Sequence, residues 1–151
     1  MKFSTRILYG LKAVLVLASR YGEGSVAVSQ IAKKERISSA YLEQILNALK
    51  KKGFVKSVRG PQGGYALAKK PSEIRLDALF YILANKNIFD MGESVKFTSD
   101  TDEITIANLI FWRKFKSSLE SSLASMSLKN LIDEARELKK SKSHAQYPFS
   151  I

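Results

Sequence analysis

Apolar residues recur every three or four positions along most of this chain of 151 residues. That spacing places them on one face of a helix. It predicts six helices, over residues 4–21, 28–35, 39–52, 76–84, 104–124 and 128–140. Ser4, Ser38 and Ser127 stand at the starts of three of these segments, where a hydroxyl can accept a hydrogen bond from a free backbone N–H group. The pattern therefore predicts a mainly helical fold.

Two short runs rich in β-forming residues, 54–58 and 65–68, interrupt the helical pattern. The segment between them, 59–64, contains three glycines and a proline, which is typical of a tight turn. Two helices joined by a short turn at 36–38 and followed by a hairpin have the order of a winged helix-turn-helix. We therefore predict a mainly α fold with a small β-hairpin wing, and a winged helix-turn-helix domain over residues 1–84.

The second half of the chain has a different pattern. Residues 85–103 show no apolar period and contain five acidic residues, which predicts a loop that is either solvated or binds a cation. The helix predicted over 104–124 carries an apolar stripe that continues just past its end. Its members are Phe111 or Trp112, then Phe115, Leu119, Leu123 and Met126. Such a stripe packs either on a second copy of the chain or on the chain's own first domain. We predict dimerisation helices over 104–140 and a flexible tail over 141–151.

The charge of the chain is concentrated in its first half. Lys and Arg number 25 against 14 Asp and Glu, a formal net charge of +11. Residues 1–75 hold 15 basic and 4 acidic side chains, whereas residues 76–151 hold 10 of each. Such asymmetry predicts that the first half binds a polyanion. An anionic membrane is the alternative partner, but it usually calls for a basic amphipathic helix or a lipidation signal, so we predict no membrane contact.

Composition argues against an enzyme. The chain contains no cysteine, which excludes disulfides, thiolate nucleophiles and cysteine-ligated metal centres. Its single histidine, His144, falls in the predicted tail and cannot form a metal site alone. No nucleophile–base or metal-ligand spacing is present, and we predict no catalytic activity, cofactor or metal. No run of about 18–20 apolar residues or signal-peptide pattern occurs, and we expect a cytoplasmic protein.

The helix predicted over 39–52 has the features of a recognition helix. A helix fits the major groove of DNA and presents side chains of its N-terminal part to base edges. Gln44 can pair with adenine through two hydrogen bonds, and Glu43 can accept one from a cytosine amino group. The candidate DNA contacts at this helix are Ser38, Ser39, Ala40, Tyr41, Glu43 and Gln44. Tyr41 also belongs to the inward apolar positions, which are Tyr41, Leu42, Ile45, Leu46 and Leu49.

The predicted wing would make a second kind of contact. Arg59 suits insertion into a narrow minor groove, and glycines allow backbone N–H groups to approach phosphates. The candidate wing residues are Arg59, Gly60, Pro61 and Gly63. Candidate phosphate contacts are Lys2, Arg6, Lys50, Lys51, Lys52 and Lys56. Each feature has a simpler explanation: lysines at a helix end neutralise its dipole, and a glycine-rich loop closes a hairpin.

Two sequence motifs resemble those of a known family. The segments 37–46 (ISSAYLEQIL) and 58–65 (VRGPQGGY) are similar to the signature of the Rrf-two family of bacterial winged-helix transcription regulators. The opening MKFST, Tyr9-Gly10-Leu11, Phe111-Trp112-Arg113 and 127–131 fit the same family, so the resemblance covers residues 1–140. It implies a homodimer that binds a palindromic operator as a sequence-specific regulator, more often a repressor, associated with DNA in a bacterial cytoplasm.

The resemblance also implies how such regulators receive signals. Members that sense through an iron–sulfur cluster carry three cysteines in the region equivalent to 85–103, and this chain has none there, which excludes a cluster held by those ligands. In a cluster-free, cysteine-responsive branch the signal comes from cysteine synthase, an enzyme that captures C-termini ending in isoleucine. The final Ile151 is a candidate for that contact. The alternative is a disordered tail, or a tail that packs on the dimer.

A basic protein that binds RNA or the ribosome is the alternative function. Gly60-Pro61-Gln62-Gly63 matches the GxxG string with which KH domains clamp RNA. In that fold the string joins two helices, whereas strand-like segments flank it here. The order of elements therefore favours double-stranded DNA as the partner.

Overall fold

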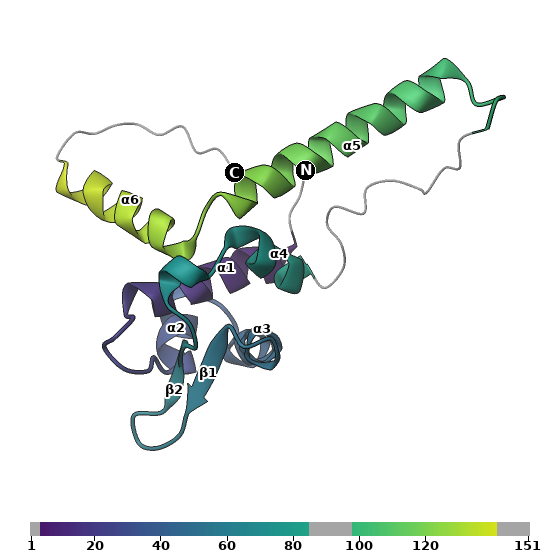
Figure 1. Cartoon of the computed structure of the whole chain (residues 1–151). Helices are drawn as coiled ribbons and strands as arrows, with labels where there is room; N and C mark the ends of the chain where they lie inside the picture. Colours follow the sequence, from purple (N-terminus) through teal and green to yellow (C-terminus); the bar gives the residue numbers. More distant parts are fainter. Residues whose placement is uncertain (1–3, 85–97, 142–151) are drawn as a thin grey trace.

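The computed structural model describes residues 4–84 and 98–141. Along the chain it contains α1 (Thr5–Ser19), α2 (Val28–Glu35), α3 (Ser39–Lys51), β1 (Val55–Val58), β2 (Gly64–Leu67), the short 3₁₀ helix η1 (Pro71–Glu73), α4 (Leu76–Ala84), α5 (Glu103–Ala124) and α6 (Leu128–Lys140). Figure 1 shows α1 to α4 and the hairpin gathered in one body, from which α5 projects as a long arm. The predicted fold class, mainly helical with a hairpin wing, is confirmed.

The core of the body is formed by apolar side chains from α1, α2, α3 and α4, together with residues of the hairpin. Four predicted inward positions of α3, Leu42, Ile45, Leu46 and Leu49, are fully buried. Tyr41 is only half-buried. Removing this much apolar surface from water is the main stabilising contribution to the body.

Helix starts agree only partly with the predicted caps. The Ser38 hydroxyl accepts a hydrogen bond from the Tyr41 backbone N–H at 3.4 Å. Ser127 accepts one from the Asn130 N–H at 3.3 Å, and the Asn130 side chain in return accepts from the Ser127 N–H at 2.8 Å. The prediction for Ser4 is wrong, because its side chain makes no cap hydrogen bond. Burial of one face of α1 in the core stabilises this helix without that cap.

The arm α5 begins with a cap formed by Asp102, a residue that the sequence predicts to lie in an acidic loop. The Asp102 carboxylate accepts from the backbone N–H groups of Ile104 and Thr105, each at 3.0 Å. It also accepts from the Thr105 hydroxyl at 2.6 Å. These bonds hold the pKa of Asp102 below its ordinary value, with the Thr105 hydroxyl as the largest cause. The helix therefore starts one residue earlier than predicted.

The hairpin is antiparallel, and Val55 pairs with Leu67 and Ser57 with Tyr65. The strand β1 begins one residue later than the predicted run 54–58, and β2 lies one residue earlier than the run 65–68. Phe54 precedes β1 because its N–H donates to the Leu49 carbonyl at 3.0 Å, which ends α3 against the core. A third segment joins the sheet through an isolated bridge between Val26 and Tyr65. The wing is thereby attached to the segment that precedes α2.

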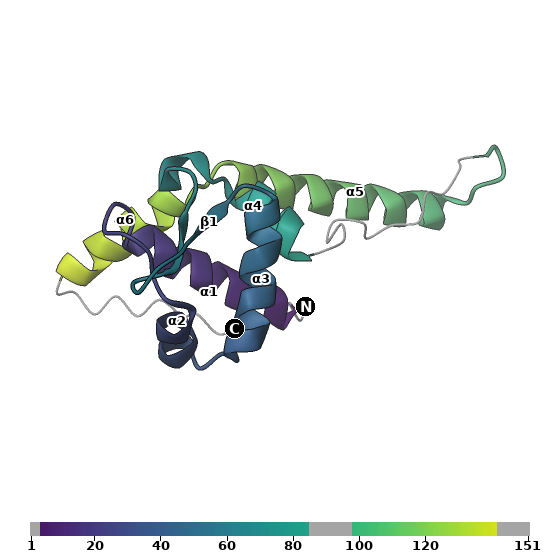
Figure 2. The ribbon, with the colours of Figure 1, turned by 90° about the horizontal axis from the view of Figure 1, so that it is seen from below.

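The junction between the body and the second half is held by backbone hydrogen bonds. The Leu76 N–H donates to the Met126 carbonyl and the Leu128 N–H to the Ile74 carbonyl, both at 3.0 Å. Leu128 is fully buried, which fixes the first turn of α6 to the body. By contrast, α5 buries none of its residues within the described part of the chain. Figure 2, a view from below, shows the same projection of α5 from the body.

No helix in residues 4–84 and 98–141 combines the length and apolar character that a membrane span requires.

Candidate DNA-binding surface

The helices α2 and α3 are joined by a tight turn of three residues. Arg36 adopts the left-handed conformation, with φ of 57°, at the C-terminal end of α2. The next residue, Ile37, donates its N–H to the Ala32 carbonyl at 2.9 Å and buries its side chain in the core. Lys12 of α1 forms an ion pair with Glu35 at 3.2 Å. These contacts fix α2 against α1 and hold the start of α3 at the surface.

The outward face of α3 carries the predicted recognition residues. Ser38, Ser39, Ala40, Glu43 and Gln44 are all exposed. Tyr41 lies between α1 and α3, with its ring against the edge of Tyr9 at a centroid distance of 6.1 Å. Its hydroxyl is 3.5 Å from the Thr5 hydroxyl. The structure therefore places the five exposed residues, Ser38, Ser39, Ala40, Glu43 and Gln44, on one open surface. The Tyr41 side chain is directed toward α1 instead.

The tip of the wing is shaped by glycines. Gly60 has a φ of 118°, a conformation that side chains rarely allow. A Cβ on Gly63 would lie 2.7 Å from the Val58 carbonyl oxygen, so a larger residue there would force the turn open. Arg59 and Pro61 are exposed beside them. The Ser25 hydroxyl donates to the Gln62 carbonyl at 2.6 Å, which anchors the turn to the segment before α2.

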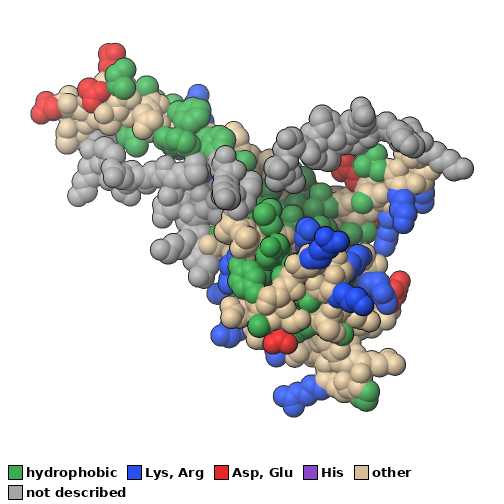
Figure 3. Space-filling model, turned by 180° about the vertical axis from the view of Figure 1, so that it is seen from behind, with side chains coloured by type: hydrophobic (Ala, Val, Ile, Leu, Met, Phe, Trp, Pro, Cys, Tyr) green, Lys and Arg blue, Asp and Glu red, His purple; other side chains and the backbone are tan. Residues whose placement is uncertain are grey.

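Most basic residues of the first half make no ion pair in the described structure. Lys12, Arg20 and Arg75 are paired with carboxylates. The basic residues of 4–75 without such a pair are Arg6, Lys33, Lys34, Arg36, Lys50, Lys51, Lys52, Lys56, Arg59, Lys69 and Lys70. Figure 3 shows Lys and Arg side chains over the body, whereas hydrophobic side chains follow the α5 arm. The body therefore presents unneutralised positive charge to solvent.

The predicted phosphate contacts occupy different surroundings. Lys50, Lys51, Lys52 and Lys56 are exposed near the end of α3 and on β1. Arg6 is half-buried, and within the described residues its buried Nε has no hydrogen-bond partner. Lys2, Ile151 and His144 lie outside the described residues, as does most of the predicted acidic loop.

Two residues of this surface were not singled out by the sequence analysis. The Tyr65 hydroxyl of β2 donates to Asn47 Oδ1 of α3 at 3.3 Å. Burial raises the pKa of Tyr65 above its ordinary value, and the nearby charge of Glu43 raises it further. Asn47 follows Glu43 by four residues and is exposed, so helical spacing alone places it on the same outward face of α3 as Glu43 and Gln44. Nothing in the sequence reveals the contact that joins Asn47 of α3 to Tyr65 of β2.

The apolar stripe of α5 divides into two parts. Leu123 and Met126, at the end nearest the body, pack on its core. Phe111 remains 56% exposed and forms a cluster with Trp112 and Phe115, at centroid distances of 5.0 and 6.1 Å. The stripe therefore packs on the core of the body only at its C-terminal end, whereas Phe111 is exposed and Trp112 and Phe115 are partly exposed.

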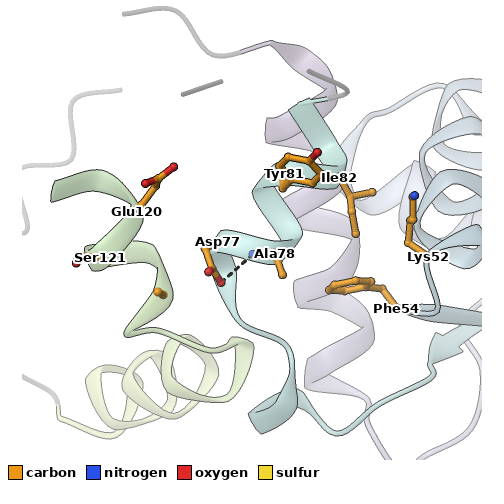
Figure 4. A pocket seen from close by; sticks show the side chains of 9 residues that line it. Lys52, Phe54, Asp77, Ala78, Tyr81, Ile82, Glu120 and Ser121 are labelled. Atoms are coloured by element: carbon orange, nitrogen blue, oxygen red, sulfur yellow. Dashed lines mark hydrogen bonds between the residues drawn. The ribbon is translucent and has the colours of Figure 1, made fainter. Parts of the chain in front are cut away.

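A hollow of about 790 Å³ lies where the arm meets the body. In Figure 4, α4 runs between Glu120 and Ser121 of α5 on one side and Lys52 and Phe54 on the other. The carboxylate of Asp77, on α4, accepts from the Ala78 N–H at 2.8 Å and pairs with Arg75. Through α4, the root of the wing is thus connected to the base of the arm.

Comparisons with known proteins agree with this architecture. The model of the Rrf2 family, described as an iron-dependent transcriptional regulator, matches residues 3–134. The regulator IscR of Photorhabdus laumondii is 32% identical over 145 residues, covering 91% of this chain and 83% of that protein. The regulator CymR of Bacillus subtilis is 40% identical over 83 residues, which are 55% of this chain and 60% of that protein. The match to CymR thus spans less than two thirds of its length.

Solved structures show the same fold. The IscR structure of T. potens has a TM-score of 0.75 at 35% identity and covers 97% of each chain. The structure of CymR, the global cysteine regulator of B. subtilis, has a TM-score of 0.73 at 30% identity over 89% of this chain and 98% of that one. Both likenesses extend through the body and the second half.

The iron named in the family description does not suit the donor atoms of this chain. None of the 151 residues is a cysteine, so thiolates cannot hold an iron–sulfur cluster. Within residues 4–84 and 98–141 no three His, Asp or Glu side chains come together as a metal site would require. The residues present therefore do not fit the cluster. With a winged helix-turn-helix body and an unneutralised basic surface, the chain belongs to the Rrf2 family of DNA-binding transcription regulators.

Proposed function

We propose that the chain represses transcription as a homodimer bound to a palindromic operator, and that it does so without an iron–sulfur cluster. The observation that carries the proposal is the exposed recognition face of α3, flanked by unpaired cations and by an anchored wing. A face of this kind supplies base-edge contacts, phosphate contacts and a groove contact together.

The recognition face carries complementary hydrogen-bonding groups. Gln44 presents an amide that can bind adenine through two hydrogen bonds. Glu43, which has no cationic partner in the described structure, presents acceptors suited to the amino group of cytosine. Ser38 and Ser39 at the start of α3 lie where phosphates bind helix N-termini. These residues are the candidates for sequence-specific contact.

The wing and the lysines would supply affinity. Arg59 stands at the base of the exposed turn, where its guanidinium can enter a minor groove. Lys50 and Lys51 at the end of α3 and Lys56 on β1 are exposed and would replace condensed counterions on the phosphate backbone. Binding through such contacts weakens as salt concentration rises.

The arm supports dimerisation. Its 22 residues extend about 33 Å and none of them is buried in the described structure. In the aromatic cluster of Phe111, Trp112 and Phe115, Phe111 is exposed and the other two rings are only partly buried, so a second copy would bury more of their surface. Two arms paired about a twofold axis would present two α3 helices to half-sites one helical turn, or a multiple of it, apart. The contact of Ile151 with cysteine synthase that the resemblance implies stays a prediction.

The test is a binding titration with the DNA upstream of the chain's own gene, labelled and mixed with excess unrelated duplex. The proposal expects a complex that survives the competitor and weakens as salt rises. A complex displaced equally by any duplex would contradict sequence specificity, and stronger displacement by single-stranded RNA would support the RNA-binding alternative.

A further inference from the structure

We propose that Asn47 reads a guanine of the operator as a hydrogen-bond donor, and that Tyr65 of the wing positions it for this contact. The inference rests on the proposed DNA-binding function and extends it to a specificity-determining pair. Neither residue belongs to the recognition set that the sequence analysis identified.

Asn47 lies on the recognition face. It follows Gln44 by three residues and Glu43 by four, and side chains at those spacings are neighbours on a helix surface. It is exposed, and in the described part of the chain its amide has one protein partner, the Tyr65 hydroxyl. The recognition face therefore extends one turn farther along α3 than the five exposed residues at its start.

Tyr65 is held rigidly enough to orient that amide. Its backbone N–H donates to the Val26 carbonyl at 2.9 Å, and its carbonyl accepts from the Val26 N–H at 2.8 Å. On its other side it pairs with Ser57 of β1. With its backbone fixed between two segments, its half-buried ring extends to α3, where the hydroxyl donates to Asn47 at 3.3 Å.

The direction of this hydrogen bond determines what Asn47 can read. An asparagine amide carries one oxygen, which accepts, and one NH₂ group, which donates. A free asparagine pairs with adenine by using both. Here the oxygen already accepts from Tyr65, which orients the amide with its NH₂ group free to donate to DNA. Guanine presents two acceptors, N7 and O6, in the major groove, so it suits a donor better than any other base.

The Tyr65 hydroxyl stays protonated at neutral pH and can therefore donate to Asn47. Burial raises the pKa of Tyr65 above its ordinary value near 10, and the charge of Glu43 adds to the effect. The hydroxyl therefore remains a donor throughout the neutral range, and the orientation of Asn47 does not change with pH there.

The experiment measures base preference at each position of a bound duplex for the full chain and for N47A, N47D and Y65F. N47A is expected to lose a guanine preference at one position of each half-site, about three- to tenfold. N47D replaces the donor with acceptors and is expected to reverse that preference toward cytosine or adenine. Y65F is expected to weaken the preference at the same position, while Y81F, which removes an exposed hydroxyl on α4, leaves it unchanged.

The outcomes separate this inference from the function on which it rests. If the unaltered chain shows no base preference at any position, the proposed function fails. If the unaltered chain is selective and N47A keeps its full profile, the assignment of Asn47 is overturned. If Y65F weakens binding to every duplex equally, with the profile unchanged, Tyr65 has only a structural role. N47A alters an exposed side chain, so its result is informative even if Y65F fails to fold.

Discussion

The carbonyl oxygen of Val26 occupies the space beside Gly64 that a side chain would need. A Cβ at position 64 would lie 2.1 Å from that oxygen, far inside van der Waals contact. The neighbouring residue Tyr65 exchanges two backbone hydrogen bonds with Val26. The absence of a side chain at Gly64 is therefore what allows the wing to pack beside the segment before α2.

Substitution of Gly64 by alanine is expected to displace the wing. The added methyl group must push backbone apart, at a cost of about 1–3 kcal/mol in the free energy of unfolding. The thermal unfolding temperature and the affinity for DNA are both expected to fall. Ser57→Ala, on the exposed face of β1, is the control and is expected to change stability by less than about 0.5 kcal/mol. Unchanged stability of G64A would show that the wing tolerates a different position.

Loss of Arg59 is expected to weaken binding to all duplexes while leaving the dimer intact. Removing one phosphate or minor-groove contact lowers the salt dependence, the slope of log K against log salt, by about 1. Fluorescence anisotropy at several salt concentrations measures this slope. Arg136→Ala, on exposed α6, is the matched control and is expected to keep the slope of the unaltered chain. If R59A instead dissociates the dimer in light scattering, the role assigned to Arg59 is wrong.

Gln44→Ala is expected to relax specificity at one base pair of each half-site. A bidentate contact from Gln44 to adenine discriminates against other bases by about 1–3 kcal/mol. Binding to unrelated duplex is expected to change little, because Gln44 carries no charge. Competition with operators substituted at single positions measures the effect. A uniform loss over all sequences would assign Gln44 to the DNA backbone instead.

Phe111→Asp is expected to convert the chain to a monomer. Phe111 is 56% exposed on the arm, so a charge there hardly affects the fold of one chain but opposes burial against a second copy. Sedimentation velocity measures the change, and circular dichroism checks that helix content is kept. Leu138→Asp, at a 39% exposed position on α6, is the control. A dimer that persists in F111D would exclude the aromatic cluster as the interface.

The stability of the first turn of α5 is expected to depend on pH. The Thr105 hydroxyl and backbone N–H groups hold the pKa of Asp102 below its ordinary value in the folded chain. Because the pKa of Asp102 is lower in the folded chain than in the unfolded chain, its ionised form stabilises the helix at pH values above the unfolded pKa. This contribution is lost as the pH falls through the folded pKa. The protection of the first-turn amides against hydrogen exchange, measured relative to the intrinsic exchange rate at each pH, is expected to fall in acid. In Asp102→Asn, which keeps a capping side chain, this acid dependence is expected to disappear.

Much of the fold follows from local pattern. The predicted bounds of α2, α4 and α6 agree with the structure because apolar spacing and breaking residues act within a few positions. The Ser4 cap failed, since packing of α1 stabilises its start without the hydroxyl. The cap at Asp102 was not predicted, because several acidic residues precede this helix and the local sequence does not show which of them accepts from the free backbone N–H groups.

The candidate surface was predictable within single elements, α3 and the wing turn, but not in the contacts between them. Exposure of Ser39, Glu43 and Gln44 follows from helical period and the apolar face of α3. The Tyr65–Asn47 contact joins residues 18 positions apart across a hairpin, and only the tertiary arrangement creates it. The division of the α5 stripe, with Leu123 on the core and Phe111 in solvent, depends in the same way on where the arm leaves the body.

Selection of bound sequences from a random duplex library tests whether the chain binds a palindromic operator as a dimer. We expect enrichment of a palindromic sequence whose half-sites lie one helical turn, or a multiple of it, apart, bound by two chains. The selected duplex is expected to bind at least about 10³-fold more tightly than unrelated DNA at physiological salt. Recovery of no common sequence, with equal affinity for every duplex, would contradict it.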